Sequence, residues 1–189
     1  MKIIFTFLFL FFTSKIFADD ISDFQIEGMS IGDSLLDYYN EIEINNYFKI
    51  GLYYEEFAEF IIYEKKNKIS NNFEDYDGLQ IVFKRNDNNL IIQSIGGNII
   101  YENNINECYK KMNEIDLEFK NIFSKLKRTD WGIIDTSDKS GNYKPITFDF
   151  NNGDRIMIAC YDFTKNNWID NLKISLYTKE YRDFIKQYH

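Results

Sequence analysis

The sequence predicts an α+β fold: a two-layer sandwich in which an antiparallel sheet of about five or six strands carries helices on one face. Three observations lead to this prediction. Two segments contain paired runs of alternating apolar residues around a polar turn, which is typical of β-hairpins. A long segment between them has the apolar spacing of an amphipathic helix. Each expected strand has one apolar face, which the long helix would cover.

The first elements are short. Residues 24–39 predict an extended piece, a glycine turn and a helix that Ser30, Asp33 or Ser34 caps. Residues 59–63 indicate a strand, although their apolar pattern fits neither the strand nor the helix period well.

The first hairpin joins residues 79–83, where apolar and polar residues alternate, to the apolar run at residues 90–95. Gly96 and Gly97 interrupt this second run, and residues 98–101 continue it after an expected β-bulge.

The clearest element is a helix over residues 105–126. Its apolar residues follow one another at alternating steps of three and four, which puts all of them on one side of the helix. They are Ile105, Cys108, Met112, Ile115, Phe119, Ile122 and Leu126.

The second hairpin joins residues 146–150 to residues 156–160 across a tight turn. A last strand at residues 172–176 and a helix at residues 179–187, capped by Thr178, complete the order of elements. Short turns between consecutive strands require antiparallel pairing.

Cys108 and Cys160 are expected to form a disulfide. The helix spacing puts Cys108 on the apolar stripe, and strand alternation puts Cys160 on the same face as Ile156 and Ile158. Both sulfurs then point into one helix–sheet interface, and the chain has no third cysteine. The alternative is a pair of free buried thiols that pack as small apolar side chains.

Residues 1–18 have the features of a secretory signal peptide. Lys2 gives a charged start, Ile3–Phe12 form an apolar run broken only by Thr6, and Ala18 is a small residue at the expected cut. The run is shorter than the roughly 20 residues of a transmembrane helix, which favours a cleaved signal peptide over the alternative, an uncleaved anchor. We therefore expect a single α+β domain over residues 19–189, located in the periplasm or secreted, with no stable membrane insertion.

The charge balance excludes several partners. Without residues 1–18, which contain two lysines and no acid, 20 basic and 30 acidic residues remain, so the net charge is −10. Such a chain is a poor ligand for nucleic acids and anionic lipids. Its one histidine, His189, leaves no histidine-based triad or zinc site, and we expect no cofactor and no metal.

Several acidic segments are candidates for chemistry, each with a structural alternative. The segment Asp149–Asp154 resembles a calcium loop, but its glycine is fifth rather than sixth, so a hairpin turn explains it better. Carboxylate pairs for hydrolysis could come from two acidic groups, for which the alternative is a solvated face. They are Glu55, Glu56 and Glu59, and Glu74, Asp75 and Asp77. Asp162, Trp168 and Asp170 could line a small pocket with Trp131, and the alternative is that the tryptophans are buried loop anchors.

Three segments carry a family resemblance. They are Ile26–Leu36 directly after the signal peptide, Glu107–Lys110 on the helix and Ala159–Asp162 on a strand. Together they resemble a group of small secreted proteins from AT-rich bacterial genomes, which implies export without implying an activity. More distantly, Gly28–Ser34 is similar to the helix start of small lipoproteins that assist outer-membrane barrel assembly, although this chain lacks the lipid-bearing cysteine.

Two functions follow as hypotheses. The first is an exported, non-enzymatic periplasmic binding or envelope-accessory module, whose partner is an unknown envelope protein or a small ligand. The second is a carboxylate-dependent hydrolase with an unrecognised site. Converging carboxyls in one pocket would favour the hydrolase, and an exposed apolar patch or unpaired sheet edge would favour the binding module.

Overall fold

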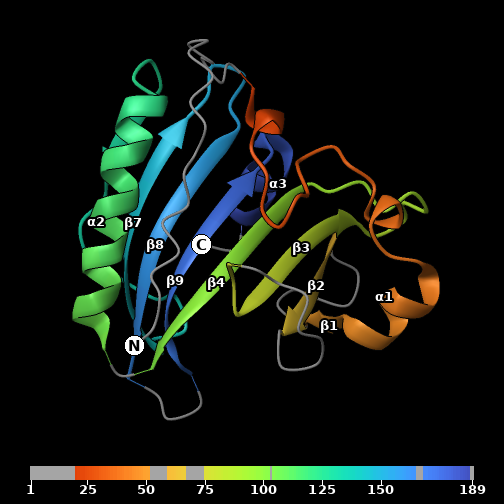
Figure 1. The fold of residues 1–189 in the computed structure, drawn as a ribbon, viewed down its shortest axis with the longest axis horizontal. Coiled ribbons are helices and arrows are strands. Elements are labelled where there is room, and N and C mark those ends of the chain that lie inside the picture. Colours follow the sequence, from red (N-terminus) through yellow and green to blue (C-terminus); the bar gives the residue numbers. More distant parts are fainter. Residues whose placement is uncertain (1–19, 52–58, 67–74, 103, 165–167, 188–189) are drawn as a thin grey trace, which may run out of the picture.

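A single antiparallel sheet of nine strands organises the protein, in the order β1-β2-β3-β4-β9-β8-β7-β5, with β6 pairing β7 off this path (Figure 1). The computed structural model describes residues 20–51, 59–66, 75–102, 104–164 and 168–187. The strands are β1 (Lys49–Gly51), β2 (Phe60–Lys66), β3 (Gly78–Lys84), β4 (Ser94–Glu102), β5 (Lys127–Asp130), β6 (Ile134–Asp135), β7 (Gly141–Asp149), β8 (Arg155–Phe163) and β9 (Asp170–Tyr177). The antiparallel α+β class is confirmed.

The predicted strand number, five or six, is too low. The six expected strands are present as β2, β3, β4, β7, β8 and β9, and β1, β5 and β6 are additional. The additional strands have two to four residues each, and β5 reads Lys-Arg-Thr-Asp. Short charged strands are common at sheet edges, where they lack the alternating apolar pattern that identifies a strand.

Both predicted hairpins form. In β3–β4, Ile81 pairs with Ile95, and in β7–β8, Ile146 pairs with Ile158. The strand β4 begins at Ser94 rather than at residue 90 and runs through its two glycines without a bulge.

The glycines of β4 make room for side chains instead of bending the strand. A Cβ on Gly96 would lie 2.8 Å from Ser175 Oγ and 2.9 Å from Lys173 Cε. A Cβ on Gly97 would collide with the ring of Tyr76. The predicted bulge was therefore wrong at this position, and the register shift lies further along, between Ile100 and Glu102.

The helices differ from the prediction at the N-terminal end. The expected helix within residues 24–39 is reduced to one 3₁₀ turn, η2 (Leu35–Asp37), and a second 3₁₀ turn, η1 (Ile21–Asp23), precedes this segment. The helix α1 (Glu41–Tyr47) follows, and it has a capping box in which Asn40 and Glu43 bond each other's backbone N–H groups.

The long helix and the C-terminal helix form as expected. The helix α2 (Ile105–Ile122) ends four residues before the prediction because β5 begins at Lys127. The helix α3 (Lys179–Ile185) is capped by Thr178, whose hydroxyl accepts a hydrogen bond from Tyr181 N. Within the part of the chain that the structure describes, no helix combines the length and apolar character needed to cross a bilayer.

The helices cover both faces of the sheet, not one as predicted. In Figure 1, α2 lies in front of the sheet and α3 lies behind it. Under α2 is the main core, to which every second residue of the strands contributes, such as Ile81, Ile158 and Leu176. The helix α3 packs Tyr181 and Phe184 on the opposite side, against Phe60, Ile62 and Val82. These apolar residues on the second face of β2 and β3 also need a cover, which a short aromatic helix provides.

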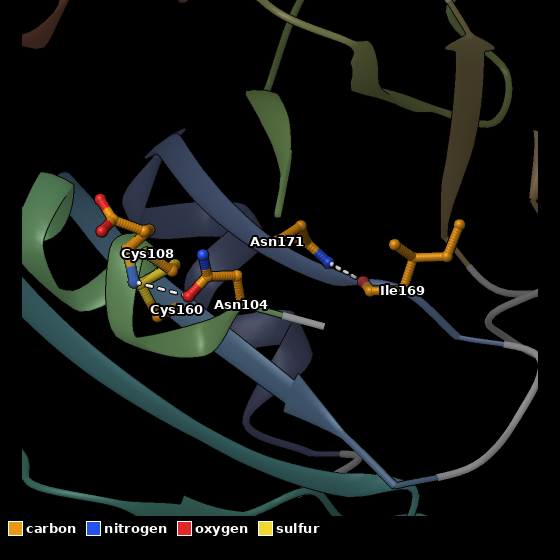
Figure 2. Close-up of a disulfide and its surroundings, with 6 residues drawn as sticks. Asn104, Cys108, Cys160, Ile169 and Asn171 are labelled. Carbon is orange, nitrogen blue, oxygen red and sulfur yellow. Dashed lines mark hydrogen bonds between the residues drawn. A yellow bond between two sulfur atoms is a disulfide. The ribbon is translucent and has the colours of Figure 1, made fainter. Parts of the chain in front are cut away.

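The predicted disulfide joins Cys108 on α2 to Cys160 on β8, with the two Cα atoms 6.0 Å apart (Figure 2). Both cysteines are fully buried within the main core. The helix spacing and the strand alternation therefore identified the correct interface.

Asp116 joins α2 to the edge of the sheet. Its carboxylate accepts hydrogen bonds from Arg128 Nε at 2.6 Å and Nη2 at 3.0 Å, and it pairs with Lys120 Nζ at 2.7 Å. Burial alone would raise the pKa of Asp116, but the hydrogen bonds from Arg128 and Lys120 hold this pKa below its usual range.

We expect the Asp116→Asn variant to be about 1–3 kcal/mol less stable than the native chain at pH 7. A lowered pKa in the folded state stabilises the protein above the unfolded-state value of about 4, and this contribution is lost as pH falls further. The stability difference should therefore shrink in acid. Urea unfolding at pH 7 and near pH 3 measures it, and an equal difference at both pH values would contradict the assignment.

Candidate binding site

The second face of β7, β8 and β9 is the best candidate for a functional surface. The helix α3 contacts this face at one end, where Tyr181 stacks on Tyr177. The residues that point to this side alternate with the core residues, and Tyr143, Tyr161 and Phe163 are all partly exposed. A partly covered sheet face that keeps aromatic side chains at the surface differs from the usual polar outer face of such a sheet.

Five aromatic residues form what we call the aromatic surface: Trp131, Tyr143, Tyr161, Phe163 and Trp168. The ring centroids of Tyr143 and Tyr161 lie 5.2 Å apart, those of Tyr161 and Phe163 5.7 Å, and those of Phe163 and Trp168 5.3 Å. The first two pairs are stacked, with interplanar angles of 8° and 14°. Each ring is thus fixed in orientation by its neighbour. Trp168 is the last ring of the row, and 46% of its surface is exposed.

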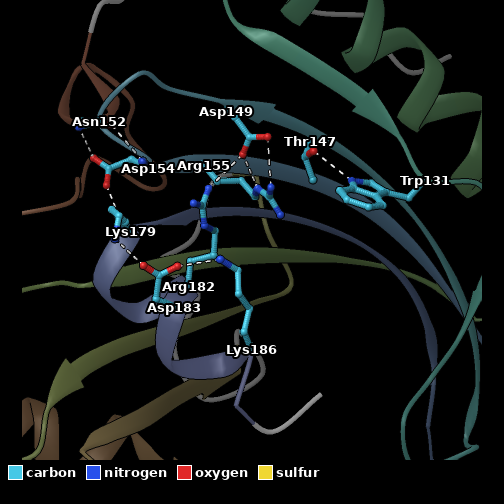
Figure 3. A network of polar contacts seen from close by, with 10 residues as sticks. All are labelled: Trp131, Thr147, Asp149, Asn152, Asp154, Arg155, Lys179, Arg182, Asp183 and Lys186. Atoms are coloured by element: carbon cyan, nitrogen blue, oxygen red, sulfur yellow. Dashed lines mark hydrogen bonds and ion pairs between the residues drawn. The ribbon is translucent and has the colours of Figure 1, made fainter.

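Trp131 lies beside this row and is fixed in position. Its Nε1 donates a hydrogen bond to Thr147 Oγ1 at 3.1 Å (Figure 3). Its backbone N–H donates to Pro145 O at 3.1 Å. The guanidinium of Arg155 lies 6.0 Å from the ring centroid. The ring nevertheless keeps 50% of its surface exposed.

An ion-pair network supports this side of the surface. Asp149 accepts hydrogen bonds from Arg155 Nε at 2.6 Å and from Arg182 Nη1 at 3.1 Å, which ties α3 to the β7–β8 hairpin (Figure 3). Asp154 adds a second tie, because its carboxylate accepts from the backbone N–H of Lys179 at 2.7 Å. The network fixes Arg155 next to Trp131, so the aromatic surface has a rigid cationic neighbour.

A small hollow of about 40 Å³ lies between α3 and strands β2, β3, β4 and β9. It is lined by Ile62, Gln80, Val82, Ser94, Gly96, Lys173, Ser175, Tyr177 and Tyr181. Lys173 Nζ donates a hydrogen bond to Gln80 Oε1, and Gln80 Nε2 donates to Glu64 Oε1 at 2.5 Å. The hydroxyl of Ser175, a residue that is 1% exposed, has no hydrogen-bond partner. Burial lowers the pKa of Lys173 to about 8, and the charge of Glu64 opposes this shift.

The predicted acidic candidates do not converge on one pocket among the described residues. Glu55, Glu56 and Glu74 lie outside the described part of the chain, and Glu59 is exposed. The carboxylate of Asp77 accepts from Ile100 N at 2.8 Å, and the backbone N–H of Asp75 donates to the carboxylate of Glu27.

The tryptophan loop is divided between two roles. Asp170 is buried and accepts from Phe163 N at 2.9 Å, so it anchors the loop that carries Trp168. Asp162 lies one residue before Phe163. Burial raises the pKa of Tyr109 on α2, and the negative charges of Asp162 and Asp170 raise it further. Trp131 is 50% exposed and Trp168 46% exposed, so neither tryptophan is the buried loop anchor that the alternative predicted.

The two loop motifs are structural. In the calcium-like segment, Asp149 bonds arginines and Asp154 bonds Asn152 and Lys179. In the segment Gly28–Ser34, the carboxylate of Asp33 accepts from Ser30 N at 2.8 Å, so this acid stabilises its own turn. No group of three or more potential metal ligands is found among the described residues.

Sequence reasoning missed the hollow and most of the aromatic surface. The alternation in β9 already separated Lys173 and Ser175 from Leu172, Ile174 and Leu176. That alternation assigns them to the second face of the sheet. The pairing of β9 with both β4 and β8 puts these residues at the centre of the sheet.

Comparison of the chain with family models, curated proteins and solved structures finds no match. The class of protein is therefore defined by the fold and surface alone: an antiparallel α+β protein with a disulfide in its core and aromatic residues on its second sheet face.

Proposed function

We propose that this protein is an exported, non-enzymatic binding module of the cell envelope, and that it binds a partner protein through the aromatic surface. The observation that carries the proposal is the pair of half-exposed tryptophans: Trp168 stacks at the end of the row of rings, and Trp131 is hydrogen-bonded to Thr147 on β7. Tryptophan, tyrosine and arginine are the residues that contribute most to protein–protein affinity.

Rigidity supports this choice. Trp131 is held by Thr147 and neighbours Arg155, while Trp168 is stacked on Phe163. Side chains that are already ordered lose little entropy when a partner binds, so their contact area contributes more to affinity. The hollow, by contrast, is far smaller than the several hundred Å³ of a typical substrate pocket.

Export is the second part of the proposal, and it depends on residues 1–18, which lie outside the described residues. Their charged start, apolar run and small residue at the cut support a signal peptide. The periplasm or the exterior of the cell is then the location of the partner.

Site-specific photo-crosslinking in the native cell tests the proposal. A photoreactive amino acid at position 168 or 131 should crosslink one partner protein. The same amino acid at Leu117, which is 61% exposed on α2, is the matched control and should not. The Trp131→Ala and Trp168→Ala variants should each weaken the purified complex at least tenfold, the effect of about 1.4 kcal/mol. Equal crosslinking from position 117, or unchanged affinity of both variants, would contradict the proposal.

A further inference from the structure

Lys173 differs from the other described lysines because it faces a hollow with only one side-chain acceptor. Its Nζ bonds Gln80 Oε1, and no carboxylate of the described residues lies within ion-pair distance. The nearest anion on the packed elements, Glu64 on β2, reaches it only through the amide of Gln80. Tyr177 and Tyr181 also line the hollow, and neither supplies a negative charge at neutral pH.

Space next to the amine comes from Gly96. Any other residue at this position would put a Cβ 2.9 Å from Lys173 Cε and 2.8 Å from Ser175 Oγ. Because Gly96 has no side chain, the end of Lys173 and the hydroxyl of Ser175 both border the same small hollow. A hollow of about 40 Å³ admits a group of a few heavy atoms, since one water needs about 10–15 Å³ on this measure.

Lys65 is a useful contrast, because it is also buried. Its Nζ lies over the rings of Tyr39, Tyr47 and Phe48, at 4.3, 5.2 and 5.6 Å from their centroids. Aromatic faces stabilise the charged ammonium and cover it. Among the described residues no aromatic ring lies this close above the Lys173 amine, and the hollow leaves the amine approachable.

We propose that Lys173 is a nucleophilic amine that captures the aldehyde group of a slender ligand as an imine. The neutral amine attacks the carbonyl carbon, forming a C–N bond, and a proton moves from nitrogen to the carbonyl oxygen to give a carbinolamine. Loss of this oxygen as water forms the C=N bond, so the step needs neither oxidant nor reductant. The unpartnered hydroxyl of Ser175 donates a hydrogen bond to the carbonyl oxygen as negative charge develops there.

The protonation state agrees with this role. With a pKa of about 8, roughly a tenth of the Lys173 side chains are neutral at pH 7. An ordinary lysine with a pKa of about 10.4 is neutral in fewer than one molecule in a thousand. The reactive fraction is thus about 200-fold larger at Lys173.

Reductive trapping with acetaldehyde and sodium cyanoborohydride tests the proposal on the full exported chain, without any partner. Peptide mass spectrometry should find Lys173 ethylated at least tenfold faster than Lys110, an exposed lysine on α2, at pH 7. The rate at Lys173 should rise with pH around an apparent pKa of about 8. Labelling of Lys173 no faster than Lys110, or a pH midpoint near 10, would overturn the proposal.

Two variants separate the roles in the hollow. Gly96→Ala fills the space beside the amine and should abolish the preference for Lys173, while Ser175→Ala should slow its labelling several-fold without moving the pH midpoint. Unchanged labelling of both variants, with Lys110 as the internal control, would also overturn the proposal. If Gly96→Ala does not fold, Ser175→Ala decides alone. Because acetaldehyde needs no partner protein, failure here leaves the proposed binding function untouched, and failure of the crosslinking experiment leaves this proposal untouched.

Discussion

Reduction of the Cys108–Cys160 disulfide should lower the free energy of unfolding by about 4 kcal/mol. The bond joins residues that are 52 positions apart. Closing a loop of this size reduces the entropy of the unfolded chain, which raises its free energy by about 4 kcal/mol at 25 °C. For a chain of this length the melting temperature should fall by about 10 °C. Both sulfurs lie in the core between α2 and β8, where Met112 and Ile115 keep α2 packed on the sheet after reduction.

Calorimetry of the oxidised and reduced protein measures this effect. The Cys108→Ala/Cys160→Ala double variant is the control, because its melting temperature should not respond to reductant. Equal melting temperatures of oxidised and reduced native protein would show that the bond does not constrain the unfolded chain.

The second large effect is expected from Phe148→Ala on β7, at about 3–5 kcal/mol. Phe148 is 1% exposed, and its ring lies 5.8 Å from that of Phe119 and 5.7 Å from that of Phe123. Removing it leaves a cavity beneath α2 that these rings cannot fill. Urea unfolding measures the change.

Phe163→Ala on β8 is the matched control for this prediction. The same side chain is removed from the other face of the sheet, where Phe163 is partly exposed and stacks on Tyr161 and Trp168. We expect a stability loss of about 1 kcal/mol and a marked loss of partner crosslinking from position 168. If the two variants were equally destabilised, the distinction between the core face and the aromatic surface would be wrong.

The sequence predicted the elements whose pattern repeats several times. The helix stripe with Cys108 and the alternation around Cys160 each rest on several residues, and together they identified the disulfide. The edge strands β1, β5 and β6 have no such repetition, because two to four residues do not define a period. The helix α1 was also missed, although Asn40 and Glu43 provide the signal of a capping box.

The functional surface was less predictable because it depends on strand order. Trp131 and Trp168 were singled out as residues of one small pocket, and Phe163 and Tyr143 were not connected with them. Pairing of Tyr143 with Tyr161 across β7 and β8 assembles the row, and this register follows only once both strands are placed. The hollow depends in the same way on β9 lying between β4 and β8, a long-range pairing that no local pattern encodes.

The position of β9 also determines when the protein can fold. The strand is last in the chain, yet it lies in the middle of the sheet, with β4 on one side and β8 on the other. Until β9 emerges, the N-terminal strands β1–β4 and the hairpin β7–β8 have no common partner and expose unpaired edges. Synthesis from the N-terminus therefore delivers the joining strand after both of its partners, and non-local pairings of this kind form slowly. The sheet stays open until then, and for the export proposed above an open chain is the state that a narrow membrane channel admits.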